Sequence, residues 1–301
     1  MAKVQLYGDY HIHTEFSGDG VATVDEIVRA AVKAGLKEIA ITDHGVAYGK
    51  KFGVRQKDIP LLCALVEKAN KEHPIKVLMG IEANVIGVNG EIDVSEELRT
   101  NLDILLAGIH PGVKMSSFKD FFLFMFPNYM AWFFRIWTKG RIRKNTEVMK
   151  RVIEKNDVDI WVHPNLFFKL DVVEVAKTCA ERGTIIELNR RIAYRPIDWE
   201  RMKATGAKFV LTSDFHDFDR HAIGVPSRTQ EELLNAVDWT PDDFINMTGE
   251  FRRGGANLLT KVKEGEYDRE EQSQEEERPV KKIKKCKERK RIEKQIRRKR
   301  T

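Results

Sequence analysis

The sequence has few cysteines and no long, uninterrupted apolar run. Its three cysteines, Cys63, Cys179 and Cys286, have no short spacing and form an odd count. This pattern argues against a disulfide framework and favours a reducing, cytoplasmic compartment. The first residues lack a basic region followed by an apolar stretch, so we expect no signal peptide. The aromatic stretch 118–137 is interrupted by charged residues and a proline, so we expect no transmembrane segment there.

The sequence also lacks a dinucleotide-binding turn, because no Gly-x-Gly-x-x-Gly follows any predicted strand. Short apolar runs instead alternate with helical patterns about seven times, which predicts a parallel sheet closed into a βα barrel. We expect this barrel to span residues 1–262, with an aromatic helical insertion at 112–140. A charged tail, 263–301, follows it.

The net charge of +6 is a property of the tail rather than of the barrel. Residues 281–301 hold 13 Lys and Arg against 2 Glu, which leaves residues 1–280 mildly acidic. Such a sequence cannot bury enough apolar area to fold alone, so we expect it to be disordered or a solvated helix. Its functional interpretation is an anion-binding arm for RNA, DNA or acidic lipid.

Histidines and carboxylates recur at the carboxyl ends of the predicted strands. The strand-end residues are His11, His13, His44, Glu82, His110, His163, Asp214 and His216, and Asp19 lies in the first loop. Each one alone is more simply explained as a hydrogen-bonded rim residue. In a βα barrel, however, all of these positions converge on one rim. Nine such groups would repel and desolvate one another unless cations were present, so the pattern predicts a site for more than one metal ion.

The order of these motifs resembles that of a known family. The segments are Asp9-Tyr10-His11-Ile12-His13, Thr42-Asp43-His44-Gly45, Gly80-Ile81-Glu82-Ala83-Asn84, Gly108-Ile109-His110, His163-Pro164-Asn165 and Thr212-Ser213-Asp214-Phe215-His216. Across about residues 4–226 they resemble the motif series of the polymerase and histidinol phosphatase (PHP) superfamily. This resemblance implies a distorted seven-stranded, TIM-like βα barrel with two to three divalent ions (Zn, Mn or Fe) that hydrolyses phosphate esters.

The resemblance also implies how the ligands are shared. One ion would be held by His11, His13, Glu82 and Asp214. A second would be bridged by Glu82 and held by His110 and His163, and a third would be held by Asp19, His44 and His216. Among these residues we assign catalytic roles to Glu82, His110, Asp214 and His216. The loop Ser17-Gly18-Asp19-Gly20 has one more Gly than the usual form, so Asp19 departs from the family pattern.

Cations held in this way would activate water as hydroxide for attack on a small phosphomonoester or a nucleotide. We expect Lys114, Arg190 and Arg191 to bind the phosphate, although solvated surface charge explains them equally well. His221 is a candidate acid for the leaving group. Within the same reaction class, the alternatives are a histidinol-phosphate phosphatase and a 3'-5' exonuclease or oligonucleotide phosphatase. The alternative from another class is a catalytically silent binding module.

Two further features have more than one interpretation. Asp9 and Asp43 flank candidate ligands and would either orient a histidine ring or cap a turn. The aromatic stretch 118–137 directly follows a candidate ligand, His110. It would form a lid, an interfacial patch for a partner or a membrane surface, or helices packed on the barrel.

Overall fold

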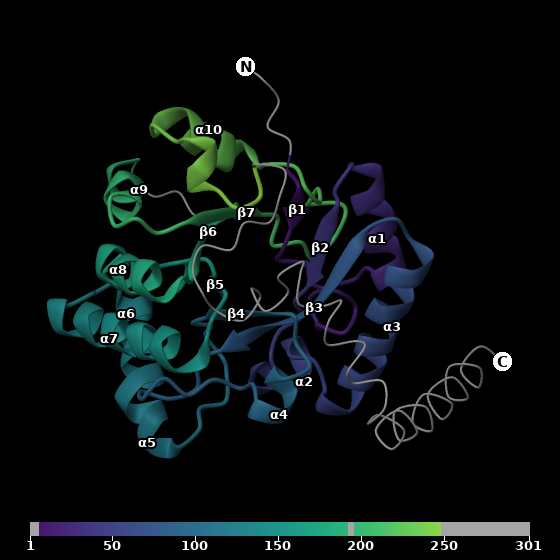
Figure 1. Ribbon diagram of the computed structural model, residues 1–301. Coiled ribbons are helices and arrows are strands. Elements are labelled where there is room, and N and C mark those ends of the chain that lie inside the picture. Colours follow the sequence, from purple (N-terminus) through teal and green to yellow (C-terminus); the bar gives the residue numbers. More distant parts are fainter. Residues whose placement is uncertain (1–5, 192–195, 248–301) are drawn as a thin grey trace, which may run out of the picture.

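The computed structural model describes residues 6–191 and 196–247. Their central element is a seven-stranded sheet in which every pairing is parallel and the strands follow one another in sequence order (Figure 1). The strands are β1 (Gly8–Asp9), β2 (Glu38–Ile41), β3 (Lys76–Asn84), β4 (Ile104–Gly108), β5 (Ile160–Trp161), β6 (Ile185–Asn189) and β7 (Phe209–Thr212).

The first and last strands meet, so the sheet curls into a nearly closed barrel. Beyond β1 and β7, Ile12 forms a parallel bridge with Phe215. The His13 N–H donates to the Phe215 carbonyl over 2.8 Å, and the Phe215 N–H donates to the His11 carbonyl over 3.1 Å. The predicted seven-unit βα barrel is therefore confirmed.

Helices follow most strands and cover the outside of the barrel (Figure 1). They are α1 (Val24–Lys33), α2 (Gly49–Phe52), α3 (Ile59–Glu72), α4 (Glu96–Arg99), α5 (Phe118–Asp120), α6 (Phe126–Phe134), α7 (Lys139–Asn156), α8 (Val172–Arg182), α9 (Pro196–Lys203) and α10 (Arg228–Ala236). Local sequence fixes several ends: Thr23 and Glu26 form a capping box at the start of α1, and Gly183 ends α8 at a φ of 73°.

Alternation along the strands separates an apolar layer from a polar one. Alternate residues of a strand share a face. On β3 this face runs from Leu78 through Gly80 to Glu82, and on β7 it begins at Val210 and leads to Asp214, just beyond the strand. The first residue of each series belongs to an inner apolar cluster formed mainly by strand residues. The barrel is thus filled with apolar side chains at one end and carries its polar residues at the carboxyl ends of the strands.

The aromatic insertion consists of α5, a π-helix at Phe121–Met125 and α6. Phe124 and Met125 are buried against the body. The side chains of Asn128 on α6 and Asn145 on α7 donate to each other over 2.9 Å and 2.8 Å. The interpretation as helices packed on the barrel therefore fits one side of this segment. No helix among residues 6–191 and 196–247 is long and apolar enough to cross a membrane. The predicted tail, 263–301, lies outside the described residues.

Candidate metal centre

The barrel brings all nine predicted side chains to the carboxyl end of its strands. Eight of them are less than a tenth exposed, and Asp19 is half-buried. Glu82 lies within β3, and the remaining eight follow β1, β2, β4, β5 or β7. Three contact groups can be distinguished among them.

The first group joins the two histidines of the first motif to two carboxylates. Nε2 of His11 lies 3.4 Å from Glu82 Oε2 and 3.6 Å from Asp214 Oδ1. Nε2 of His13 lies 3.5 Å and 3.6 Å from the same two oxygens. The two imidazoles thus point between the same pair of carboxylate oxygens.

The second group uses the other oxygen of Glu82. Oε1 lies 3.1 Å from His110 Nε2 and 2.7 Å from His163 Nε2, and the two nitrogens are 3.0 Å apart. Glu82 therefore faces two sets of histidines with its two oxygens.

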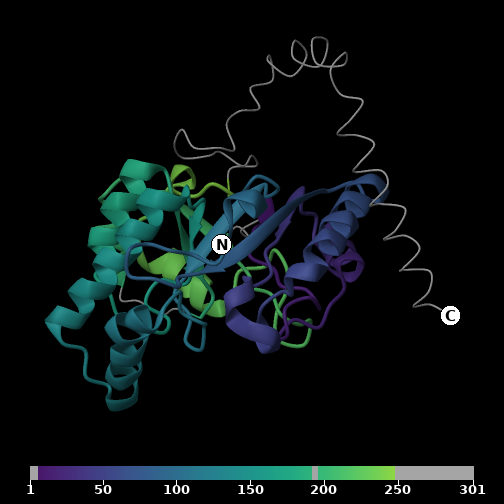
Figure 2. The same ribbon diagram turned by 90° about the horizontal axis from the view of Figure 1, so that it is seen from below.

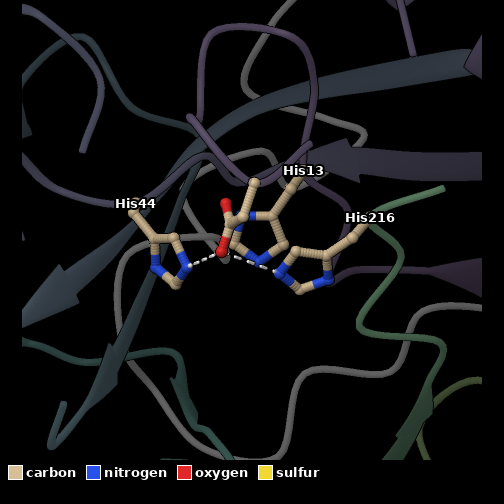
Figure 3. Close-up of side chains that lie close together, drawn as sticks. His13, His44 and His216 are labelled. Carbon is tan, nitrogen blue, oxygen red and sulfur yellow. Dashed lines mark ion pairs between the residues drawn. The ribbon is translucent and has the colours of Figure 1, made fainter. Parts of the chain in front are cut away.

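The third group surrounds Asp19. His44 and His216 place their Nε2 atoms 3.4 Å from its Oδ2, one on either side, with His13 beside them (Figure 3). The His44 Nδ1 also lies 2.6 Å from Glu82 Oε2, so this ring lies between Asp19 and Glu82. The extra residue of the loop, Gly18, fits because it has no side chain: a Cβ there would lie 1.6 Å from the Lys51 carbonyl oxygen.

The spacings of the first and third groups fit shared cations better than hydrogen bonds. Two donors about 2.1 Å from one tetrahedral ion are about 3.4 Å apart, whereas hydrogen bonds are about 2.7–3.0 Å long. The 3.4–3.6 Å separations of the first and third groups match the former value. Within the described part of the chain, His11 Nε2, His13 Nε2 and Glu82 Oε2 make no hydrogen bond although they are buried. Buried polar atoms normally have partners, so this donor set fits divalent transition metal ions.

The charges of the cluster are strongly coupled. Burial raises the pKa of the Glu82 carboxyl, but His110, His44 and His11 together hold that pKa well below its usual range. Burial lowers the pKa of His44, but the Glu82 and Asp19 carboxylates outweigh it and raise the pKa to about 10. Burial and the neighbouring His216 and His44 lower the pKa of His13 well below normal. Without cations, the cluster is balanced by protons on some of its imidazoles.

The sequence interpretation missed Glu187 on β6. Its Oε1 lies 2.6 Å from His11 Nδ1. Because a carboxylate accepts, this nitrogen carries a proton, and in the neutral ring that a metal ligand needs, Nε2 would present its lone pair to the cluster. Glu187 also accepts from the His163 N–H over 2.5 Å and from the Thr212 hydroxyl over 2.5 Å. The available signal was a lone carboxylate inside the apolar run 185–188.

Of the two alternatives for Asp9 and Asp43, the structure favours the turn cap over the orientation of a histidine ring. Asp9 accepts from the backbone N–H groups of Ser213 and Gly224. Asp43 accepts from the N–H and hydroxyl of Thr14. Both carboxylates therefore hold loops at the rim, which is the turn-capping alternative.

Two candidate ligands have strained backbones. Asp214 has a φ of 46° and His163 a φ of 29°, in a region that side chains with a Cβ rarely adopt. Such strain costs about 1–3 kcal/mol and concentrates at functional sites. Gly108 makes room for the second group, because a Cβ there would lie 2.7 Å from His163 Cε1.

The three predicted phosphate-binding residues lie in different places relative to the cluster. Arg191 approaches the cluster, with Nε 3.4 Å from Asp214 Oδ2. Arg190 lines a cavity of about 190 Å³ together with Ser213, His221 and Gln230. Lys114 is exposed, and its ammonium group makes no ion pair with any residue that the structure describes. His221 Nδ1 accepts from the His216 N–H over 2.9 Å, so this ring supports the chain at a candidate ligand.

The sequence pattern of a family described as "PHP domain" matches residues 9–155. The chain carries a PHP domain. Its match covers β1 to α7, whereas His163, Asp214 and His216 lie beyond the matched residues. Relatives extend over this part as well. A probable phosphatase of Proteus mirabilis is 28% identical over 260 residues, covering 80% of this chain and 94% of that protein. A probable phosphatase of Caldanaerobacter subterraneus is 29% identical over 232 residues, covering 71% and 78%.

A solved structure is also similar to this PHP domain protein. It is histidinol phosphate phosphatase from Lactococcus lactis, in complex with zinc, L-histidinol and phosphate. The two are 15% identical with a TM-score of 0.48, over 78% of this chain and 93% of that one.

Proposed function

We propose that this protein is a metal-dependent phosphoesterase that hydrolyses a small phosphomonoester or a nucleotide. The observation that carries the proposal is the spacing in the first and third groups, where the buried atoms lie 3.4–3.6 Å apart, farther than in hydrogen bonds and at the distance expected of ligands that share an ion. The PHP domain and the probable phosphatases among its relatives support the same reaction class.

In this proposal the three contact groups are three ion sites. His11, His13, Glu82 and Asp214 would hold one ion, Glu82 with His110 and His163 would hold a second, and Asp19 with His44 and His216 would hold a third. Glu82 would contribute to the first two sites, because each of its oxygens faces a different pair of imidazoles. His44 connects the third site to Glu82 through its second ring nitrogen.

The protein's own residues prepare this centre for phosphate. Bound divalent cations lower the pKa of water and neutralise charge that develops on a phosphoryl group. Glu187 keeps the lone pair of His11 aimed at the centre by holding the proton on the opposite nitrogen. Arg191 lies at the edge of the centre, where its guanidinium can bind a phosphate oxygen.

The cavity beside Arg190 is the proposed place for the rest of the substrate. Nη1 of Arg190 is buried and has no hydrogen-bond partner among the described residues. The cavity also reaches Ser227, the N-cap of α10, so its walls favour a polar or anionic group. Lys114 stays a weaker candidate, because nothing holds its side chain near the cluster.

Three alternatives remain as proposals to be tested. Histidinol phosphate is one phosphomonoester of suitable size. An oligonucleotide phosphatase or 3'-5' exonuclease would use the basic residues 281–301 to hold a nucleic acid. A silent binding module would keep the barrel without turnover.

The test combines metal content with turnover. The purified full chain is analysed for zinc, manganese and iron, and is then assayed with an aryl phosphate, a panel of phosphorylated metabolites and short oligonucleotides. We expect about two to three ions per chain and turnover with at least one phosphomonoester. A folded protein that binds no metal and hydrolyses none of these compounds would favour the silent module.

Glu82→Gln is the decisive variant for the bridge. It removes the charge that both groups share, so we expect the loss of two ions and of turnover. The matched control is Glu38→Gln. Glu38 is also a buried carboxylate, but it begins β2 at the opposite end of the barrel and pairs with Lys76 over 2.5 Å. Turnover of Glu82→Gln near the parent level would refute the bridging role.

A further inference from the structure

The insertion carries most of the large apolar side chains that are exposed in the described part of the chain. Of the fourteen large hydrophobic side chains exposed in the described residues, nine lie between Phe118 and Ile136. We name six of them the aromatic face: Phe118, Phe122, Phe126, Trp132, Phe133 and Phe134, which are 44–87% exposed. Soluble domains rarely expose a continuous apolar patch of this kind without a binding role.

The helical geometry gathers these rings on one projecting element. Phe118, Phe122 and Phe126 follow one another in steps of four across α5, the π-helix and α6, and the rings of Phe122 and Phe126 are 5.9 Å apart. Phe133 and Phe134 lie at the end of α6, with rings 5.1 Å apart. Figure 2 shows this segment extending away from the barrel. Its opposite side is anchored by the buried Phe124 and Met125.

Cations accompany the aromatic face along the sequence, and one of them, Arg141, donates to the Leu123 carbonyl over 3.3 Å. Between residues 118 and 144 the positive side chains are Lys119, Arg135, Lys139, Arg141, Arg143 and Lys144. The one acidic residue in this range, Asp120, is already engaged by the Ser116 and Ser117 hydroxyls and the Val88 N–H. None of the six cations forms an ion pair with another described residue. The segment therefore combines exposed aromatic rings with a net positive charge.

We propose that the aromatic face docks onto the surface of an anionic phospholipid bilayer. Aromatic rings, tryptophan in particular, favour the interface between headgroups and acyl chains, and nearby Lys and Arg bind anionic headgroups. A second copy of this chain fits the face less well. Symmetric pairing would bring two sets of six unpaired cations together, and like charges oppose such an interface.

Docking would bring the carboxyl end of the barrel to the lipid surface. The segment begins eight residues after His110. The Tyr129 hydroxyl on α6 accepts from the N–H of Gly112, two residues after His110. The aromatic face is thus attached directly to the rim that carries the candidate metal centre.

The experiment measures binding of the full chain to lipid vesicles. Vesicles of phosphatidylcholine are compared with vesicles that also contain phosphatidylglycerol, and a second pair carries brominated acyl chains, which quench nearby tryptophan. We expect binding to the anionic vesicles only, with quenching that Trp132→Phe removes. The other described tryptophans are less exposed, so they serve as internal references.

Two variants with matched controls separate the aromatic face from other causes. Phe133→Ser, at a side chain 74% exposed, should weaken vesicle binding about tenfold, whereas Ile197→Ser, 49% exposed on α9, should not. Lys139→Glu should weaken binding about tenfold, whereas Lys68→Glu on α3 should have little effect.

Three results would overturn the proposal. The first is vesicle binding that Phe133→Ser leaves unchanged, which would assign docking to the basic residues 281–301. The second is quenching that persists in Trp132→Phe. The third is a dimer of the parent protein that Phe133→Ser converts to a monomer, which would show that a second copy covers the aromatic face.

Discussion

Replacing Glu187 by Gln should weaken metal binding although this residue is not itself a candidate ligand. The carboxylate is surrounded by donors: the His11 ring, the His163 N–H, the Thr212 hydroxyl and the Asn189 amide. A glutamine of the same shape offers one accepting oxygen and one amino group that can only donate. One buried donor would therefore face another, and His11 would lose the charge that fixes its tautomer.

The size of the effect follows from these contacts. Loss of a carboxylate that orients a metal-binding histidine typically costs about 10- to 100-fold in metal affinity, which is about 1.4–2.8 kcal/mol. The donor left unsatisfied should also lower the free energy of unfolding by about 1–3 kcal/mol. Metal affinity is measured by competition with a chelator of known strength, and stability by denaturant unfolding of the metal-free protein.

The matched control is Asp93→Asn. Asp93 is another enclosed carboxylate with several donors, the N–H and side-chain amide of Asn84 and the N–H of Ala47, but no imidazole. This control should lose stability with little change in metal affinity. If Glu187→Gln and Asp93→Asn retain equal metal affinity, the orienting role of Glu187 is refuted.

Three further predictions concern the second group, the protons and the tail. Gly108→Ala should displace His163 and lower turnover at least tenfold, because its Cβ would lie 2.7 Å from that ring; Gly140→Ala, where the nearest atom is 4.0 Å away, should leave turnover unchanged. Adding zinc to the metal-free protein at pH 7 should release protons, because the pKa of His44 is about 10 and a ligand imidazole must be neutral, so affinity should rise with pH. Calorimetry in buffers of different ionisation enthalpy measures this release, and heats that do not depend on the buffer would contradict it. Deleting residues 265–301 should leave turnover of a small substrate intact, and its collapse would show that the tail contributes to the site.

The positions of the nine clustered side chains could be predicted because strand ends are visible in the sequence. Parallel strands all deliver their carboxyl ends to the same rim, so the clustering needs no knowledge of long-range packing. The barrel class follows from the same alternation of strands and helices. The roles of the nine residues as metal ligands stay a prediction for the elemental analysis to test.

The support of the cluster could not be predicted in the same way. Glu187 and His11 are 176 residues apart and meet only because β1 and β7 close the barrel beside β6. For Asp9 and Asp43 the sequence left two alternatives open, because it does not show that both carboxylates contact distant segments rather than the neighbouring histidines. The aromatic content of the insertion was evident, but which of its rings are exposed depends on how α6 packs against α7.

The closure between Ile12 and Phe215 has a consequence for the chain as a polymer. The segments on either side of this bridge carry His13 and Asp214, which share the first proposed ion site, so one ion there would fasten the two ends of a loop of about two hundred residues. Removing the ion with a chelator would then weaken this closure first. The segments that follow β1 and β7 would separate, while β2 to β6 kept their neighbours.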